Sequence, residues 1–362
     1  MDTKVVTVQA RGETFSYEAE QALREAGEVL RAGGLVAFPT ETVYGLGGDA
    51  LNPESARKIY AAKGRPSDNP LIVHIARMED LKAIVRQVPG EALVLARAFW
   101  PGPLTMIFPK ADCVPRETTG GLETVAVRMP AHPVARGLIL RGGGYVAAPS
   151  ANLSGRPSPT AARYVIEDMD GRIDMILDGG EGEIGLESTI VDLTVSPPQI
   201  LRPGSVTRDM LEAVLGQVSI DRTILEADSG QAPRAPGMKY RHYAPQGELT
   251  IIAGPVARVT DYINVHGAKD REQGHKVGVI GTDEALAQYR ADVVRSLGSR
   301  QDEAGIARHL YGILREFDDL QVTRIYSECF EASGLGQAIM NRLLKAAGHR
   351  LIVLDAADQA GE

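Results

Sequence analysis

Apolar and polar residues along this chain follow two periodicities, which predict helices and strands in alternation. Apolar side chains recur at helical spacing between residues 18 and 32, and a glycine pair follows as a stop signal. Short apolar runs bounded by Gly, Pro or polar residues predict buried strands. We expect helices at 18–32, 54–62, 89–99, 301–318 and 335–347. We expect strands at 35–38, 71–75, 125–128, 145–148, 175–177, 189–193, 249–253, 276–280, 323–327 and 351–354.

This order of elements predicts an α/β protein with two domains. The chain has 362 residues, which exceeds the usual size of a domain with a single hydrophobic core. The first domain, 1–218, lacks a strict βαβ rhythm, so we expect a twisted mixed sheet. The second, 248–362, has a Rossmann-like order and is smaller. Residues 219–247 read as a linker, but 238–243 are rich in large functional side chains, so we expect this linker to fold back over another part of the protein.

Composition narrows the function classes. The chain is 44% hydrophobic and 24% charged, as in ordinary globular proteins. A net charge of −8 argues against a protein that mainly wraps nucleic acid. Cys113 and Cys329 have no metal-ligand spacing, which favours free thiols in a reducing compartment. We find no signal peptide and no apolar span of membrane length, and therefore expect a soluble cytoplasmic protein.

A cationic segment stands out at 63–70, with the sequence KGRPSDNP. Lys63 and Arg65 lie among Gly and Pro, so we expect both on a loop and not on a helix face. Such a loop can direct two charges at one anion, and Arg adds a planar fork suited to phosphate or carboxylate. The alternative is a solvated basic turn.

Hydroxyl-rich loops follow two predicted strands. Residues 39–47, PTETVYGLG, come directly after a buried strand, where open α/β sheets bind ligands, although a polar turn has the same composition. Residues 148–160, APSANLSGRPSPT, can form a nest of backbone N–H groups, although a Ser/Pro linker looks similar. His74 alternates out of an apolar strand, which is usual for a core histidine and favours a ligand role only in this company.

Further cations close other predicted turns. Arg128 ends an apolar strand and is either exposed or a buried anion clamp. Arg156 and Arg202 lie in Gly/Pro turns of the same domain. No nucleophile–base pair, GxxxxGK[ST], HExxH or CxxC motif is present. Residues 180–185 match GxGxxG, but a strand follows them instead of a helix, which excludes a dinucleotide fingerprint. This chemistry favours binding polyanions and aligning substrates over covalent catalysis.

Seven motifs in order make the chain similar to a known family. They are PTETVYGLG, KGRPSDNPLIVHI, FWPGPLT, VAVRMPAHP, APSANLSGRPSPT, ESTIVDLT and ILRPGSVT. They resemble the threonylcarbamoyl-AMP synthase family, with its YrdC-like domain. APGMKYRHYAP and the C-terminal part resemble the two-domain form. The resemblance extends from about residue 18 to the C-terminus.

The resemblance implies a YrdC-like catalytic domain that converts L-threonine, bicarbonate and ATP into threonylcarbamoyl-AMP and pyrophosphate. It implies Mg²⁺ on the triphosphate without a dedicated protein cage. It also implies indirect links to threonylcarbamoyl-transfer proteins and to tRNA, which is modified next to the anticodon, and no membrane partner.

The resemblance also assigns residues. The expected catalytic residues are Lys63, Arg65, Ser150 and Asn152. The expected ATP contacts are Lys63, Arg65, Asn69, Thr124, Asn152, Thr160 or its neighbour Ser158, Arg202 and Tyr243. The resemblance implies that the linker, 219–247, folds back over the active site and brings Tyr243 to the nucleotide. The expected threonine contacts are Thr42, His74, Arg128, Ser150 and Ser188, with Arg128 binding the carboxylate bidentately.

Two other functions compete with synthesis. A YrdC-like domain could act as an RNA-binding or regulatory module, but the acidic balance and the hydroxyl-rich threonine set disfavour it. A carbamoyl-transferring enzyme can contain such a domain within a longer chain, but zinc-finger and kinase-like segments are absent from this sequence.

Overall fold

The computed structural model describes residues 2–12, 14–221, 224, 234–235, 242–331 and 333–354. By their contacts, residues 1–154 and 158–240 form one compact unit, unit 1, and residues 155–157 and 241–362 form unit 2. The expected ranges, 1–218, 219–247 and 248–362, stay a prediction. The first unit extends beyond 218 because a strand at 219–220 pairs with its sheet, and three residues of the 148–160 loop group with unit 2.

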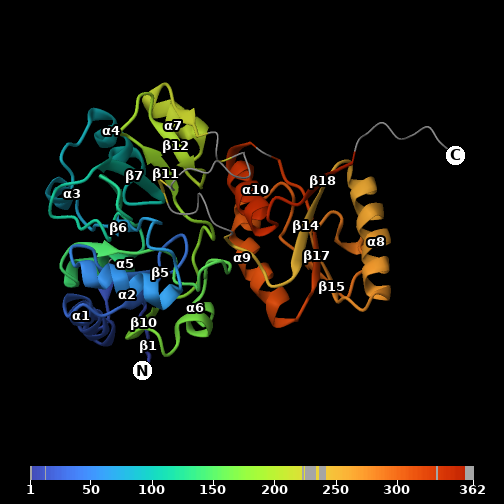
Figure 1. Cartoon of the computed structure of the whole chain (residues 1–362), viewed down its shortest axis with the longest axis horizontal. Coiled ribbons are helices and arrows are strands. Elements are labelled where there is room, and N and C mark those ends of the chain that lie inside the picture. The colour runs from blue at the N-terminus through green and yellow to red at the C-terminus, as the bar shows by residue number, and fades with distance from the viewer. Residues whose placement is uncertain are drawn as a thin grey trace. The chain divides into compact units, whose positions relative to one another are not determined.

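Unit 1 is built on a mixed eleven-stranded sheet (Figure 1). In spatial order its strands are β1 (Lys4–Thr7), β10 (Met175–Asp178), β4 (Val36–Phe38), β5 (Gly45–Asp49), β9 (Val146–Ala147), β6 (Ile72–His74), β8 (Thr124–Arg128), β7 (Leu104–Pro109), β11 (Thr189–Asp192), β12 (Gln199–Arg202) and β13 (Ser219–Ile220). Its helices are α1 (Tyr17–Arg31), α2 (Pro53–Lys63), α3 (Met78–Ile84), α4 (Gly90–Phe99), α5 (Pro133–Arg141), α6 (Ala162–Met169) and α7 (Arg208–Leu215). A short hairpin, β2 (Ala10–Arg11) and β3 (Thr14–Phe15), precedes α1.

The predicted mixed sheet and the elements expected in unit 1 are confirmed, but the glycine-rich segment at 45–49 forms strand β5 instead of a polar turn. Glycine is needed there because neighbours approach closely. A Cβ atom at Gly47 would lie 2.9 Å from side-chain atoms of Phe38 and Val146. Glycine lowers strand propensity but permits such packing, so composition alone pointed to the wrong element.

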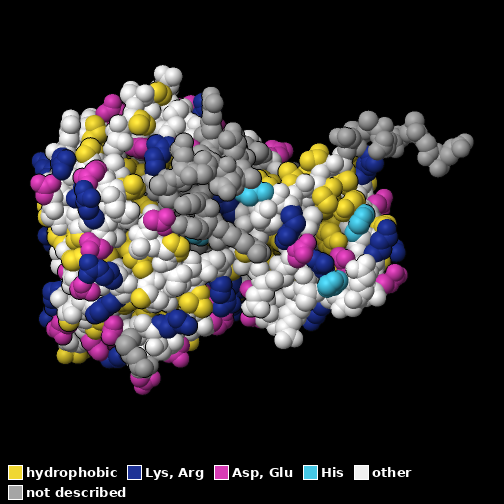
Figure 2. Space-filling view, viewed as in Figure 1, with side chains coloured by type: hydrophobic (Ala, Val, Ile, Leu, Met, Phe, Trp, Pro, Cys, Tyr) yellow, Lys and Arg dark blue, Asp and Glu magenta, His cyan; other side chains and the backbone are white. Residues whose placement is uncertain are grey.

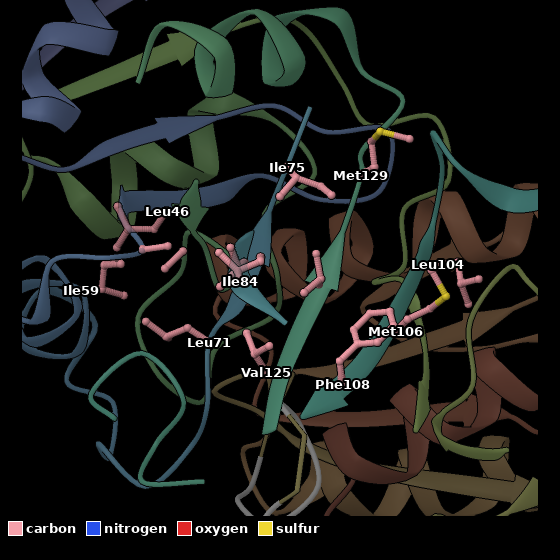
Figure 3. Packing of buried hydrophobic residues seen from close by; sticks show 14 of the residues in the cluster. Leu46, Ile59, Leu71, Ile75, Ile84, Leu104, Met106, Phe108, Val125 and Met129 are labelled. Atoms are coloured by element: carbon pink, nitrogen blue, oxygen red, sulfur yellow. The ribbon is translucent and has the colours of Figure 1, made fainter. Parts of the chain in front are cut away.

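The two faces of the sheet around β6, β8 and β7 differ. One face forms the main core, which includes Met106 and Phe108 of β7 and Val125 of β8 (Figure 3). The opposite face has a smaller apolar cluster made by strand residues and one residue of the expected linker. Its members are Ile72, Ile107, Ala126, Ile190, Leu201 and Ala235. Because this apolar cluster is small, the face that carries it, called the second face below, leaves the polar ends of its strands available for a site.

Unit 2 has a parallel five-stranded sheet, as the Rossmann-like prediction requires. Its spatial order is β16 (Val293–Ser296), β15 (Val277–Gly281), β17 (Arg324–Glu328), β14 (Glu248–Ala253) and β18 (Leu351–Val353). Helix α8 (Val256–Glu272) covers one face, and α9 (Glu303–Asp319) and α10 (Gly334–Ala346) lie on the other (Figure 1). A 3-10 turn, η2, spans Leu286–Gln288. None of the helices in the described ranges is long and apolar enough to cross a membrane.

Candidate active site

A row of side chains crosses the second face of the unit 1 sheet. The strand registers pair His74 with Arg128, Arg128 with Thr105, Thr105 with Ile190, and Ile190 with Arg202. Directly opposed residues of paired strands place their side chains on the same face. His74, Arg128, Thr105 and Arg202, which are far apart in the sequence, are therefore brought into one line across β6, β8, β7, β11 and β12.

Arg128 is held in this row by a buried carboxylate. Its side chain donates from Nη2 to Glu41 Oε1 at 2.6 Å, from Nη1 to Thr42 Oγ1 at 3.0 Å and from Nε to the Gly102 carbonyl at 3.3 Å. Arg128 is only 4% exposed and Glu41 6%. A buried cation requires such a partner. These bonds use three of the five guanidinium N–H groups, so within the described residues two remain for a ligand.

Glu41 is the residue of this cluster that sequence reasoning did not assign. Burial favours its neutral form, but the charge and hydrogen bond of Arg128 outweigh burial and hold the pKa of Glu41 below its ordinary value. A signal was present in the sequence, since Glu41 lies between Thr40 and Thr42 in the hydroxyl loop after β4. The two threonine hydroxyls lie 2.8 Å apart, which fixes Thr42 beside Arg128.

His74 is a neutral imidazole next to this pair. Burial, and after it the nearby charge of Arg128, lower the pKa of His74 to about 3. Its Nδ1 lies 3.1 Å from the Ile72 carbonyl, and its ring meets Phe38 edge to face at 6.2 Å between centroids. His74 therefore offers a neutral polar edge to the row and is not a proton carrier near neutral pH.

The other end of the row joins a predicted threonine contact to a predicted ATP contact. Arg202 is 5% exposed and donates from Nε to the Ser188 carbonyl at 3.0 Å and from Nη2 to Ser188 Oγ at 3.2 Å. The Ser188 hydroxyl lies 2.7 Å from Thr105 Oγ1. Thr105 was not predicted as a site residue. It contacts Ser188 at the Arg202 end of the row and lies opposite Arg128 in the strand register, so it connects the two ends.

A second cluster gathers three of the four predicted catalytic residues. The Lys63 Nζ donates to the carbonyls of Ser150 and Asn152, and the Ser150 hydroxyl donates to Asn152 Oδ1. The expectation that Lys63 lies on a loop is wrong, because it is the last residue of α2. The helix ends at Gly64, whose positive φ of 60° turns the backbone immediately after Lys63.

Arg65 and Asn69 belong to the turn that follows. Arg65 donates from Nη2 to the carbonyls of Asn69 at 3.3 Å and Pro70 at 3.2 Å. The Asn69 side chain is 1% exposed, and neither its Oδ1 nor its Nδ2 has a hydrogen-bond partner among the described residues. Buried amides are normally satisfied, so this one leaves one donor group and one acceptor atom open to a ligand.

The remaining predicted contacts fall in three places. The Ser158 hydroxyl donates to Glu187, and the Thr160 carbonyl accepts from the Gly182 N–H at 2.9 Å. Thr124 begins β8 and alternates onto the same face as Arg128. Tyr243 lies in unit 2, where its ring is 5.3 Å from that of Tyr311. Its expected contact with the nucleotide stays a prediction.

Two described residues of the expected linker lie on the second face of the unit 1 sheet. Arg234 donates to Gln199 Oε1 at 2.9 Å, and it forms ion pairs with Asp192 and Asp221. Ala235 is fully buried in the apolar cluster of that face. Asp192 pairs with Ile107 in the strand register, so this linker segment lies beside the row that contains Arg128 and Arg202.

Known proteins resemble the whole chain. A family profile named Sua5_yciO_yrdC, described as "Telomere recombination", matches residues 28–204, and one described as "Threonylcarbamoyl-AMP synthase, C-terminal domain" matches residues 206–348. A threonylcarbamoyl-AMP synthase of Pyrococcus abyssi is 50% identical over 333 residues, which cover 92% of this chain and 96% of the relative. The Bacillus subtilis protein of that name is 48% identical over 97% of this chain and all of its own length. The chain belongs to the threonylcarbamoyl-AMP synthase family.

Solved structures of this family show the same architecture. The crystal structure of P. abyssi Sua5 complexed with L-threonine matches with a TM-score of 0.91 at 48% identity, over 98% of this chain and the whole of that one. A doubly substituted form of the same protein matches with a TM-score of 0.90 at 47% identity, over 97% of this chain and 98% of that one. The two-domain form of the family, expected from the motifs, is thereby confirmed.

The described residues contain no group of three or more His, Cys, Asp or Glu side chains arranged to hold a metal ion.

Proposed function

We propose that this protein is a nucleotidyltransferase that makes L-threonylcarbamoyladenylate and pyrophosphate from L-threonine, bicarbonate and ATP. The observation that carries the proposal is the row on the sheet face, which aligns the buried guanidinium groups of Arg128 and Arg202 on either side of Thr105. Two anionic substrates must be held side by side for this reaction, and the row provides two fixed cations joined by hydroxyl groups.

The Arg128 end fits an amino acid. A threonine carboxylate would accept the two guanidinium N–H groups that the protein contacts leave open, and Glu41 keeps the guanidinium from rotating away. Neutral His74 and the hydroxyls of Thr42 and Ser188 supply polar partners without adding charge. A neutral imidazole leaves the threonine amine free of an added cationic neighbour.

The Lys63, Arg65 and Arg202 groups fit the nucleotide. Bicarbonate takes up a proton and loses water to give carbon dioxide. The unprotonated threonine amine attacks the carbon of that carbon dioxide, the electrons of one C=O bond move onto oxygen, and the nitrogen releases a proton, which leaves a carbamate. A carbamate oxygen then attacks the α-phosphorus of ATP in line, the bond to the β-phosphate oxygen breaks, and pyrophosphate leaves. Lys63 and Arg65 stabilise the negative charge that develops, and the Ser150–Asn152 pair positions the phosphates.

The substrate set includes Mg²⁺ bound to ATP, which neutralises the triphosphate. The product is an activated threonylcarbamoyl group, which we propose is passed to transfer proteins that modify tRNA next to the anticodon. The cytoplasmic location expected from the sequence stays a prediction.

A direct assay tests the proposal. The full chain is incubated with L-threonine, bicarbonate and Mg·ATP, and pyrophosphate and the threonylcarbamoyl adenylate are measured. We expect equal amounts of both, and we expect neither when threonine or bicarbonate is omitted. Pyrophosphate release that ignores threonine, or none at all, would refute the synthesis.

The binding-module alternative receives less support. Basic and acidic side chains are interspersed over the visible face of unit 1 (Figure 2), which is not the continuous basic surface that favours nucleic acid. If the assay yields no product while the chain binds RNA tightly at physiological salt, the alternative would replace the synthase.

A further inference from the structure

A small cavity lies within unit 2, at the carboxyl ends of two neighbouring strands. Its volume is about 40 Å³, and its walls include Ile252 of β14 and Glu328 of β17. These two residues are opposed in the strand register, so their side chains lie on the same face of the sheet. One buried water needs about 10–15 Å³, so the cavity has room for a group of about three non-hydrogen atoms.

The connections that follow these two strands are of the kind that creates a ligand site. Strand β14 leads into α8 and β17 leads into α10, and these helices lie on opposite faces of the parallel sheet (Figure 1). Where neighbouring connections leave to opposite faces, open parallel sheets bind ligands in the crevice at the carboxyl ends of the strands. The turn between β14 and α8 contains one glycine, Gly254, and therefore lacks the GxGxxG motif that binds a dinucleotide. The place and the volume favour a small ligand.

The carboxylate of Glu328 already has its full set of donors. Glu328 is 2% exposed, and it accepts the Tyr289 hydroxyl at 2.9 Å. It also accepts the N–H of Thr282 at 3.0 Å and the hydroxyl of Thr282 at 3.1 Å. The fourth donor is Nη2 of Arg300. A carboxylate has about four acceptor sites, so Glu328 has no site left for a cation or for another donor.

Arg300 is the wall residue that keeps hydrogen-bonding capacity. Besides its bond to Glu328, it donates from Nη1 to the Cys329 carbonyl at 3.1 Å, and its Cζ lies 5.8 Å from the centre of the Phe330 ring. These contacts fix the guanidinium and, among the described residues, use two of its five N–H groups. Open donors on a fixed, planar guanidinium suit a planar anion. Because the Arg300–Glu328 pair is neutral as a whole, a ligand with one negative charge fits better than one with two.

We propose that this cavity is a binding site for a small monoanionic carboxylate. The carboxylate accepts hydrogen bonds from Arg300, and its short aliphatic part contacts the apolar walls at Ile252, Val256 and Val259. Val256 is 46% exposed, so the cavity opens to solvent beside it. The site lies in unit 2, whereas the row that carries the proposed synthesis lies in unit 1, so the site does not depend on that synthesis.

A titration with propionate tests the proposal. The full chain is labelled at the methyl groups of Ile and Val and is followed by NMR at constant ionic strength. We expect saturable shifts of the Ile252, Val256 and Val259 methyl signals, with a Kd of about 1 mM. These signals are local, so propionate bound at Arg128 is not counted. No saturable shift at these methyl groups would overturn the site.

Two comparison probes test the chemical class of the ligand. 1-Propanol has the same aliphatic part without the charge, and inorganic phosphate is more highly charged and has no aliphatic part. We expect each to bind at least about tenfold more weakly than propionate, because only propionate uses both Arg300 and the apolar walls. If either binds as tightly as propionate, the assignment to a monoanionic carboxylate is wrong.

Arg300→Lys tests the donor. Lysine keeps a positive charge beside Glu328 but loses the planar fork, and we expect the Kd for propionate to rise about tenfold. Arg295→Lys is the matched control, since Arg295 is an arginine of unit 2 that pairs with Glu316 and is not part of the cavity wall. It should keep the wild-type Kd. Unchanged affinity in Arg300→Lys, or equal weakening in both variants, would refute the role of Arg300.

Val256→Phe tests the cavity without altering the buried ion pair. The larger side chain narrows the opening, and the exposure of Val256 lets the protein fold around it, so the shifts at Ile252 and Val259 should disappear. Val265→Phe is the matched control, because Val265 lies on the same helix, is 52% exposed and is outside the cavity wall. It should bind propionate as the wild type does. Normal binding by Val256→Phe would overturn the proposal, and this pair of variants decides the matter if Arg300→Lys does not fold.

Discussion

Two groups of cations in unit 1 are fixed in different ways. Arg128 is held mainly by side chains, since two of its three hydrogen bonds go to the carboxylate of Glu41 and the hydroxyl of Thr42 and the third to the Gly102 carbonyl. Lys63 and Arg65 donate to main-chain carbonyls of Ser150, Asn152, Asn69 and Pro70. The first arrangement depends on one particular carboxylate, whereas the second depends on the path of the backbone. A point substitution can remove a carboxylate but cannot remove a carbonyl.

Removing that carboxylate should have the largest effect. Glu41→Ala leaves the buried guanidinium of Arg128 without its anionic partner, and we expect a loss of about 3–5 kcal/mol in the free energy of unfolding of unit 1. The single tryptophan, Trp100, is buried in unit 1, so its fluorescence during chemical denaturation reports this loss. The control Glu123→Ala removes an exposed partner of Arg116 and should change stability by less than about 1 kcal/mol. Equal effects of both substitutions would contradict a special role for Glu41.

The second substitution concerns the backbone-held group. Arg65→Ala should lower the rate of pyrophosphate release, as kcat/KM for ATP, by about a hundredfold, because a fixed charge at the developing anion is lost. The Lys63 carbonyl contacts remain, so Trp100 fluorescence should still show a folded protein. Arg57→Ala, which removes an exposed arginine of the preceding helix, serves as the control and should keep full activity. Full activity of Arg65→Ala would remove this turn from the mechanism.

The side-chain-held group should also respond to pH through His74. The pKa of His74 is about 3 in the folded protein against an ordinary value of 6.5, so below pH 6.5 the unfolded chain binds a proton that the folded protein does not bind. The contribution of His74 to the free energy of unfolding is therefore fully present above pH 6.5, and it should fall by about 2 kcal/mol between pH 6.5 and 5. Denaturation of His74→Gln over this range should show a shallower decline than the wild type. Parallel curves would mean that His74 is not held neutral by its surroundings.

The smallest expected effect is a difference in substrate preference between variants at the two ends of the row. Arg128→Lys keeps the charge but loses the planar fork, and we expect the KM for threonine to rise about tenfold with a much smaller change for ATP. Arg202→Lys should show the opposite preference. Steady-state kinetics with each substrate varied in turn measures both ratios. If the two variants affect both substrates alike, the row does not divide into a threonine end and an ATP end.

Much of the fold could be predicted from the sequence because helix and strand signals are local. The apolar spacing of α1 and the apolar run of β6 are read within about 15 residues, and each element formed within one or two residues of its expected position. Strand β5 was missed because glycine is a poor strand former by local propensity. Its glycines are required by the close approach of Phe38 on β4 and Val146 on β9, and this approach exists only in the folded chain.

The candidate site shows the same division. Motif order identified the residue types that recognise anions, including Arg128, Arg202 and the Lys63–Arg65 pair. It did not identify Glu41 as the partner of Arg128, since 87 positions separate them in the chain. It also missed Thr105, an unremarkable strand residue that gains its role only from lying opposite Arg128 in the register.

By itself the sequence determined the α/β class, the two-domain family and the chemical character of the site, because short-range patterns and ordered motifs encode them. Only the tertiary structure decided that Arg128 and Arg202 share one row and that Glu41 neutralises Arg128. Strand register and long-range burial set these contacts, and both depend on which distant segments the folded chain brings together.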